Sequence, residues 1–166
     1  MNNNKYTISE AGMDDIPELT RIRIEYLLEA FDSISNEEIY RLQNKLPLYF
    51  ERTLGKSCIA FIAKDSGRIV SSAILVIYER PISPVLLTGL IGEVVSVYTI
   101  PLYRKQGLCS ELIKKLVEYG RINRIDRINL SATPMGATVY EKQGFNQFHT
   151  PYIDMRYEYA KEQAII

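Results

Sequence analysis

One stretch of the sequence, from Ile91 to Tyr119, limits most strongly how the chain can fold. Its first part reads IGEVVSVYTIP and is rich in β-branched and aromatic residues, which predicts a buried or half-buried strand that ends at Pro101. In its second part apolar residues recur at helical spacing between charged ones, which predicts an amphipathic helix. These apolar positions are Leu108, Leu112, Leu116 and Val117. The order is therefore strand, basic turn, helix.

Side chains along the predicted strand should alternate between two faces. The expected faces are Glu93, Val95, Val97 and Thr99 on one side and Val94, Ser96 and Tyr98 on the other.

The turn that joins this strand to the helix is the first candidate binding site. Arg104 and Lys105 put two cations where the helix begins, and Gly107 lets the main chain approach a ligand closely. The first N–H groups of a helix are unpaired and its dipole is positive at that end, so such a place binds phosphate. The alternative is an ordinary solvated basic turn.

Two segments resemble the GNAT acyltransferase superfamily. Arg104, Gly107 and Cys109 are similar to its Arg/Gln-x-x-Gly-x-Gly/Ala signature, with cysteine where the family usually has glycine or alanine. The segment ATVYEKQGF, from Ala137 to Phe145, is similar to a second family segment on the fourth helix and the following strand. Glu93 stands 14 residues before Gly107, as does the strand carboxylate that serves as general base in some members.

The resemblance implies an α/β protein with the GNAT fold, in which helices flank both faces of a central mixed, splayed β-sheet. We expect residues 1–166 to form one such domain, since this length suits a single core. The strand that carries Glu93 and a strand that begins at Arg127 should be parallel, joined by a right-handed crossover. By resemblance these two strands splay apart, and the pantetheine arm of acetyl-CoA enters the gap.

The resemblance also implies roles for individual residues. The cofactor-binding set is Val95 and Val97 through their main chains, Arg104, Lys105, Gln106, Gly107, Leu108, Cys109 and Thr133. Glu93 is the candidate general base, because a desolvated carboxylate has a raised pKa; its alternative is a solvent-facing or arginine-paired carboxylate. Tyr140 is the candidate general acid for the CoA sulfur, and its alternative is one more core aromatic.

The chemistry so implied is direct transfer of an acetyl group from acetyl-CoA to a primary amine of a small molecule or peptide. A non-catalytic acyl-CoA-binding sensor is the alternative from a different class, and a phosphate-binding domain for another nucleotide is the third. No motif identifies the acceptor.

Composition narrows the other classes of function. Twenty lysines and arginines balance twenty acidic residues, which argues against a nucleic-acid binder. Cys58, Cys109 and the single histidine, His149, have no metal-ligand spacing, so no metal site is expected. No run approaches the length of a membrane helix and no signal core is present, which favours the cytoplasm.

The remaining elements are predicted from periodicity and turn signals. Asp15 with Glu18, and Ser35 with Glu38, form capping-box patterns that open two helices, and Pro47 should kink or split the second. Thr133 is the expected N-cap of a later helix. The expected strands are residues 6–9, a hairpin of 58–63 and 69–78, a strand over 127–131, and two final strands over 145–148 and 154–159. Tail tyrosines such as Tyr152, Tyr157 and Tyr159 suggest either a homodimer interface or core packing.

Overall fold

The computed structural model describes residues 5–159. Its helices are α1 (Ile16–Ala30), α2 (Asn36–Thr53), α3 (Leu108–Ile122) and α4 (Pro134–Glu141), with short 3-10 turns at Met13–Asp15 and Pro101–Tyr103. Its strands are β1 (Thr7–Glu10), β2 (Cys58–Asp65), β3 (Arg68–Glu79), β4 (Leu90–Thr99) and β5 (Arg127–Leu130). None of the described helices is long and apolar enough to cross a membrane.

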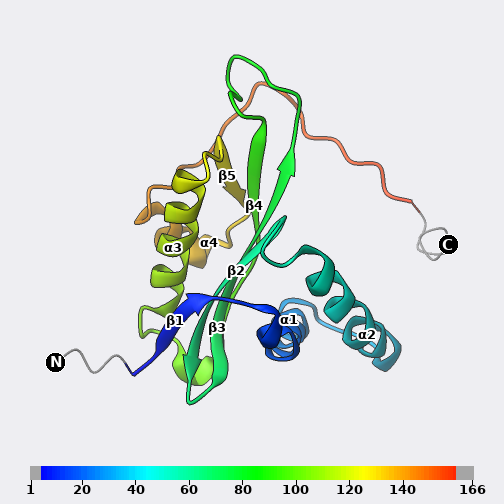
Figure 1. Ribbon diagram of the computed structural model, residues 1–166. Helices are drawn as coiled ribbons and strands as arrows, with labels where there is room; N and C mark the ends of the chain where they lie inside the picture. The colour runs from blue at the N-terminus through cyan, green and yellow to red at the C-terminus, as the bar shows by residue number, and fades with distance from the viewer. Residues whose placement is uncertain (1–4, 160–166) are drawn as a thin grey trace.

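The five strands form one mixed sheet in the order β1-β2-β3-β4-β5 (Figure 1). The first three neighbouring pairs are antiparallel, whereas β4 and β5 are parallel, as the crossover through α3 predicts. The β2–β3 hairpin closes through Ser66 and Gly67, which both have positive φ (50° and 85°), the geometry of a two-residue hairpin turn.

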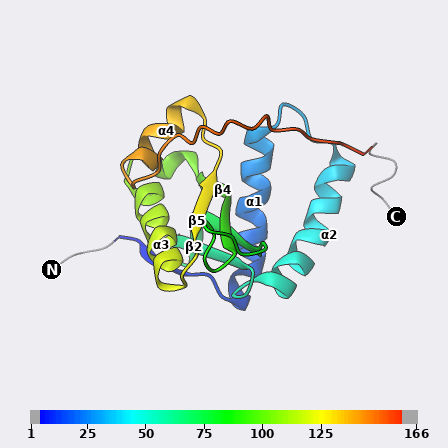
Figure 2. The same cartoon turned by 90° about the horizontal axis from the view of Figure 1, so that it is seen from above.

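Helices cover both faces of this sheet, with α1 and α2 on one side and α3 and α4 on the other (Figure 2). Alternate residues of β2 enter the two cores: Cys58, Ala60 and Ile62 pack with α1 and α2, and Ile59, Phe61 and Ala63 pack with α3. A strand that is buried on both faces is apolar at every position, which is why β2 reads as a continuous apolar run. The expected splayed, mixed α/β sheet is confirmed.

The start of α1 differs from the prediction. Asp15 does not cap it, because its carboxylate accepts the N–H of Gly12 (3.0 Å) and pairs with Lys64 (2.5 Å). Glu18 does not complete a capping box either; it accepts the guanidinium of Arg21 and the backbone N–H of Ile69, which fastens α1 to β3.

The second helix begins as predicted. Ser35 accepts the N–H of Glu38, and the Glu38 carboxylate accepts the N–H of Ser35, so the capping box is present. Pro47 does not split α2, which is one helix over Asn36–Thr53. Proline leaves the carbonyl four residues earlier without its helical partner. That residue is Gln43, which is exposed, so water can satisfy the carbonyl.

A β-bulge at Val95 corrects the expected alternation along β4. Ile74 of β3 pairs with Ser96 and Leu75 pairs with Val94, so Val95 is the extra residue on its strand. Val94 and Val97 consequently both pack on the α3 side. Glu93 was predicted on the face opposite Ser96 and Tyr98. In the structure all three lie on the face of β4 that α1 and α2 cover.

Two predicted strands, 145–148 and 154–159, are absent. In the described part of the tail no residue after α4 pairs with a strand, so the four-residue β5 is the edge of the sheet. The segment instead leads past the end of the sheet to the side of the molecule where α2 lies (Figures 1 and 2). Tyr152, Tyr157 and Tyr159 are 73% to 81% exposed, so core packing does not explain them.

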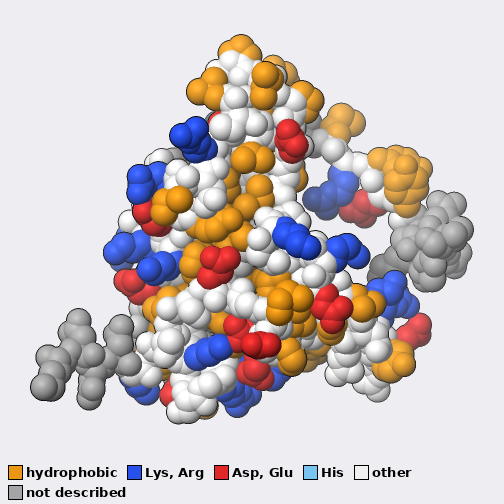
Figure 3. Space-filling view, viewed as in Figure 1, with side chains coloured by type: hydrophobic (Ala, Val, Ile, Leu, Met, Phe, Trp, Pro, Cys, Tyr) orange, Lys and Arg blue, Asp and Glu red, His pale blue; other side chains and the backbone are white. Residues whose placement is uncertain are grey.

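The loop between β3 and β4 is a surface loop. Pro81 and Pro84 are exposed, and the nearby Ile82, Val85 and Leu87 form an apolar tip at one end of the molecule (Figure 3).

Candidate active site

A cavity of about 640 Å³ opens where β4 and β5 separate. Their ladder ends at the pair Val94 and Leu130, and the rest of β4 has no strand partner on that side among residues 5–159. The cavity wall consists of Val94–Thr99 on β4, Leu130, Ser131, Thr133, Gly136 and Tyr140 beyond it, Tyr26, Glu29 and Ala30 on α1, and Arg104 and Cys109 at the start of α3. The site is therefore built by the splay, with α1 and α4 contributing walls.

The turn before α3 lies where the sequence predicts it. Gly107 is the N-cap and has φ of 80°, the left-handed region that glycine adopts without strain. Lys105 also has positive φ (60°) and is exposed. The side chain of Leu108 is buried in the α3 core, so only its main chain is available at the turn.

Gln106 ties the turn to the rest of the molecule rather than facing the cavity. Its amide donates to the Leu102 carbonyl (3.3 Å), and its oxygen accepts the hydroxyl of Tyr6 at the start of β1.

Arg104 lines the cavity but already has a carboxylate partner. Its Nη2 contacts both carboxylate oxygens of Glu29 at 2.7 Å and 2.6 Å, its Nε donates to the Thr99 carbonyl, and its guanidinium lies 5.6 Å from the centre of the Tyr98 ring. The Tyr98 hydroxyl donates to the same Glu29. The Arg104 hydrogen bond holds the pKa of Glu29 below its usual value. Glu29 and Tyr98 thus orient the cation that the sequence assigned to phosphate.

Tyr140 and Cys109 stand on the cavity wall in a desolvated environment. Burial, with Cys109 and Tyr26 as neighbours, raises the pKa of Tyr140 to about 12. Burial also raises the pKa of the Cys109 thiol. The Tyr140 ring is held edge-on by Phe145 (6.1 Å between centres), the last residue of the ATVYEKQGF segment. The tyrosine therefore carries its proton at neutral pH beside the cavity.

The cavity face of β4 offers main-chain groups at its bulge. Val95, the bulge residue, is 37% exposed. Ser96 is buried and its hydroxyl has no partner among the described residues. Thr133 is the N-cap of α4, as predicted. Its hydroxyl oxygen accepts the N–H of Gly136 (3.1 Å), so this oxygen already has a hydrogen-bond partner.

Glu93 is brought to the same face as Ser96 but does not line the cavity, and it is exposed. Glu93 is therefore not desolvated, contrary to the expectation from the sequence.

Sequence reasoning missed Tyr26 and Glu29 as cavity residues. Tyr26 lies on the side of α1 that packs against the core, and its ring is edge-on to Tyr98 (6.1 Å between centres). No local pattern singles out Glu29, because its role comes from partners 69 and 75 residues away.

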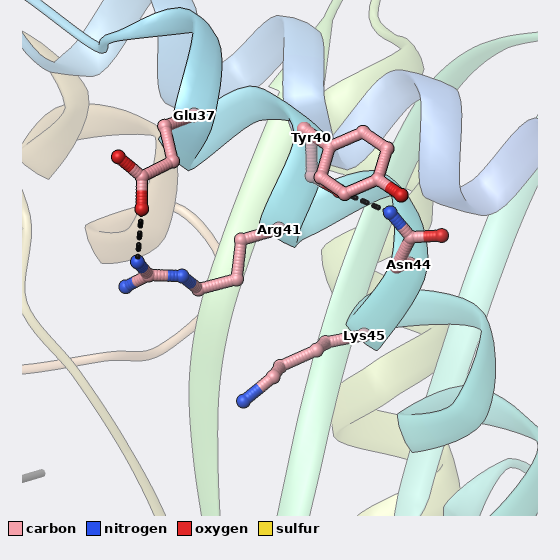
Figure 4. A pocket seen from close by; sticks show the side chains of 5 residues that line it. All are labelled: Glu37, Tyr40, Arg41, Asn44 and Lys45. Atoms are coloured by element: carbon pink, nitrogen blue, oxygen red, sulfur yellow. Dashed lines mark hydrogen bonds and ion pairs between the residues drawn. The ribbon is translucent and has the colours of Figure 1, made fainter. Parts of the chain in front are cut away.

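A second depression, of about 400 Å³, lies on the exposed face of α2 (Figure 4). All five lining residues come from this one helix, and they interact mainly with each other, as Glu37 does with Arg41 (3.2 Å). One helix face does not enclose a ligand, so we assign the site to the β4–β5 cavity. Within residues 5–159 no cluster of three or more histidine, cysteine or acidic residues is arranged to hold a metal ion.

Several proteins of known structure share this fold. A predicted acetyltransferase with acetyl-CoA from Clostridium acetobutylicum has a TM-score of 0.77 and 25% identity, with 91% of this chain and 96% of that one covered. A GCN5-related N-acetyltransferase from Ralstonia eutropha JMP134 shares the fold at a TM-score of 0.72 and 18% identity, over 92% and 98% of the two chains.

Glucosamine-6-phosphate N-acetyltransferase from Arabidopsis thaliana shares the fold at a TM-score of 0.64 and 16% identity, over 93% and 99%. A search of curated proteins gave no match. The sequence model of the Acetyltransferase (GNAT) family matches residues 18–145, which is most of the chain. The chain therefore belongs to the GNAT acetyltransferase family.

Proposed function

We propose that the protein is an acetyl-CoA-dependent N-acetyltransferase that moves an acetyl group directly to a primary amine of a small molecule or peptide. The observation that carries this proposal is the β4–β5 cavity, with the Gly107 turn at the start of α3 beside it and the Tyr140 phenol on its wall.

The chain's own groups fit acetyl-CoA at this cavity. Gly107 is left-handed with open space where a Cβ would lie, so the main chain can approach a pyrophosphate, and the first N–H groups of α3, which have no partner among the described residues, can bind it. Lys105 adds an exposed cation, while Arg104, paired with Glu29, positions the turn. Cys109 lines the cavity where the family usually has glycine or alanine. Val95 and Val97 supply main-chain groups for the pantetheine arm, with Thr133 across the gap.

Acetyl-CoA supplies a reactive thioester, so the protein's task is placement and proton transfer. Tyr140 acts as general acid toward the sulfur. Its raised pKa keeps the proton on the phenol, and the same burial that raises the pKa of the Cys109 thiol would make a CoA thiolate there more basic. The pKa of the CoA thiol thereby comes closer to that of the Tyr140 phenol, which makes proton transfer from the phenol to the thiolate easier.

Glu93 acts as general base through a water, since it is exposed and shares a face of β4 with Ser96, which lines the cavity. A main-chain N–H in the bulge at Val95–Val97 stabilises the oxyanion.

We further propose a cytosolic location, in line with two unpaired cysteines, and a homodimer through the exposed tail tyrosines. Sedimentation of the full chain tests the dimer.

Calorimetric titration with acetyl-CoA tests the proposal first. We expect wild-type protein to bind in the micromolar range and an Arg104→Ala, Gly107→Glu variant to lose binding. Arg121→Ala, at the far end of α3, is the control that retains it. No binding by the wild type would overturn the proposal.

Thiol release with a panel of amines then tests the chemistry. Tyr140→Phe should lower turnover by about 100-fold with acetyl-CoA affinity unchanged, since a positioned acid contributes on that order. Binding without turnover on any amine would instead support the acyl-CoA sensor.

A further inference from the structure

Arg23 on α1 is a cation that the reaction described above does not use. It is partly buried, and its Nη1 donates to the carbonyl of Val95, the bulge residue, at 3.2 Å. Its guanidinium also lies 5.0 Å from the centre of the Tyr26 ring. Because Val95 and Tyr26 both line the cavity, Arg23 stands at the α1 side of the site.

This arginine has no acidic partner within residues 5–159. The other arginines on α1 and in the turn before α3 do: Arg21 pairs with Glu18 and Glu25, and Arg104 pairs with Glu29. The only side-chain hydrogen bond of Arg23 in that range uses Nη1, so the edge formed by Nε and Nη2 is left without an acceptor. That edge is the fork which binds a carboxylate through two parallel hydrogen bonds.

An unpaired cation in such a place is costly to the folded protein. Burial lowers the pKa of Arg23 from its ordinary value, while the nearby phenols of Tyr26 and Tyr49 act in the opposite direction. Buried charges in proteins are as a rule paired, and one that is not paired is a candidate for function. A bound anion would supply the missing partner.

We propose that Arg23 binds a carboxylate of the acceptor, so that the substrate is an amine that also carries a carboxylate group. This rests on the proposed acetyltransferase function and names the class of its acceptor. A lone guanidinium balances one negative charge, which suits a carboxylate better than a phosphate monoester with its charge of about −1.5 to −2. The contact to the bulge carbonyl places this anion site next to the strand segment where the amine would react.

Matched acceptors test the proposal: L-α-amino acids and short peptides, each compared with its C-terminal amide. Wild-type protein should acetylate the free acids with a kcat/KM about 10- to 100-fold above that of the amides, the loss expected when one charged hydrogen-bond pair is removed. Arg23→Gln should abolish this preference by raising the KM of the acids. Its KM for the amides and its affinity for acetyl-CoA should stay unchanged.

Two further variants separate binding from folding. Arg23→Lys should recover part of the preference, because it keeps the charge but loses the fork. Arg121→Gln, an exposed arginine on α3, is the control without effect. Thermal unfolding of Arg23→Gln should occur at the same temperature as wild type or higher, since a partly buried charge without an acidic partner is removed.

Four outcomes would overturn the inference: equal rates for acids and amides in the wild type, an equal loss on both in Arg23→Gln, weaker acetyl-CoA binding in that variant, or no binding of the acids to acetyl-CoA-loaded protein. The first two leave the acetyltransferase function standing. Failure of the wild type to bind acetyl-CoA defeats the proposed function itself, so the two failures are distinguishable.

Discussion

Arg104 in the turn before α3 holds both carboxylate oxygens of Glu29 at the end of α1, with Nη2 at 2.7 Å and 2.6 Å from them. The pair joins the candidate phosphate turn to the helix that forms the opposite wall of the cavity. One of the two cations of the turn is therefore partly neutralised before any ligand binds, and we expect Glu29 to affect the affinity of the site.

Glu29→Gln should tighten acetyl-CoA binding severalfold at low salt, because it removes a negative charge near the bound phosphates and frees Arg104. The gain should shrink as ionic strength rises and screens the charges. Both side chains are partly exposed, so the free energy of unfolding should fall by less than about 1 kcal/mol. Calorimetry at two salt concentrations measures the effect, with Glu118→Gln at the far end of α3 as control. Weaker binding by Glu29→Gln would contradict this account.

Gly107→Ala should lower the free energy of unfolding by about 1–2 kcal/mol, the cost of a left-handed conformation for a residue with a Cβ. Nothing lies within 4 Å of the added carbon, so the cost comes from φ alone and not from a clash. Gly12→Ala is the matched control, since its surroundings are equally open and its φ is −105°. Urea unfolding of the three proteins measures the difference. Equal stability of the two variants would show that the turn is free to change conformation.

Glu18 should make the protein sensitive to acid. The Arg21 hydrogen bond, against the opposing effect of burial and together with the Ile69 N–H, holds its folded pKa below the ordinary value of 4.5. Between these two pKa values the unfolded chain binds more protons, so stability is fully present above 4.5 and is lost as pH falls through the lower folded value. Urea midpoints measured from pH 6 downward should fall less steeply in Glu18→Gln than in wild type. Parallel curves would refute the assignment.

The pH profile of kcat should show no decline near the ordinary tyrosine pKa of 10.0, because the pKa of Tyr140 is raised to about 12. At saturating amine, turnover should stay level from neutral pH to about pH 10. A stopped-flow record of thiol release across this range checks the expectation. A decline centred at the ordinary tyrosine value, absent in Tyr140→Phe, would mean that the phenol is not desolvated during turnover.

Several elements could be predicted from the sequence because their causes are local. The hairpin over 58–78 follows from apolar runs and a turn that contains Gly67, and Thr133 caps α4 through a residue three positions on. Gly107 stands directly before α3, where the sequence places the turn, although its left-handed φ was not predicted. Local signals also misled where other partners were available: the carboxylate of Asp15 pairs with the distant Lys64, and that of Glu18 accepts the N–H of the distant Ile69 and the guanidinium of the nearby Arg21, so neither completes the predicted capping box.

The sequence by itself determined the strand, basic turn and helix around Gly107 and the order of elements from β1 to α4, since hydrophobic period and turn chemistry act over a few neighbouring residues. Only the tertiary structure decided the bulge at Val95, because a bulge exists only in register with a partner strand. It likewise decided the pairing of Arg104 with Glu29 and the lack of an acidic partner for Arg23 within the described residues. Which charges meet depends on how α1 packs on β4, a contact between segments some 70 residues apart that no local pattern encodes.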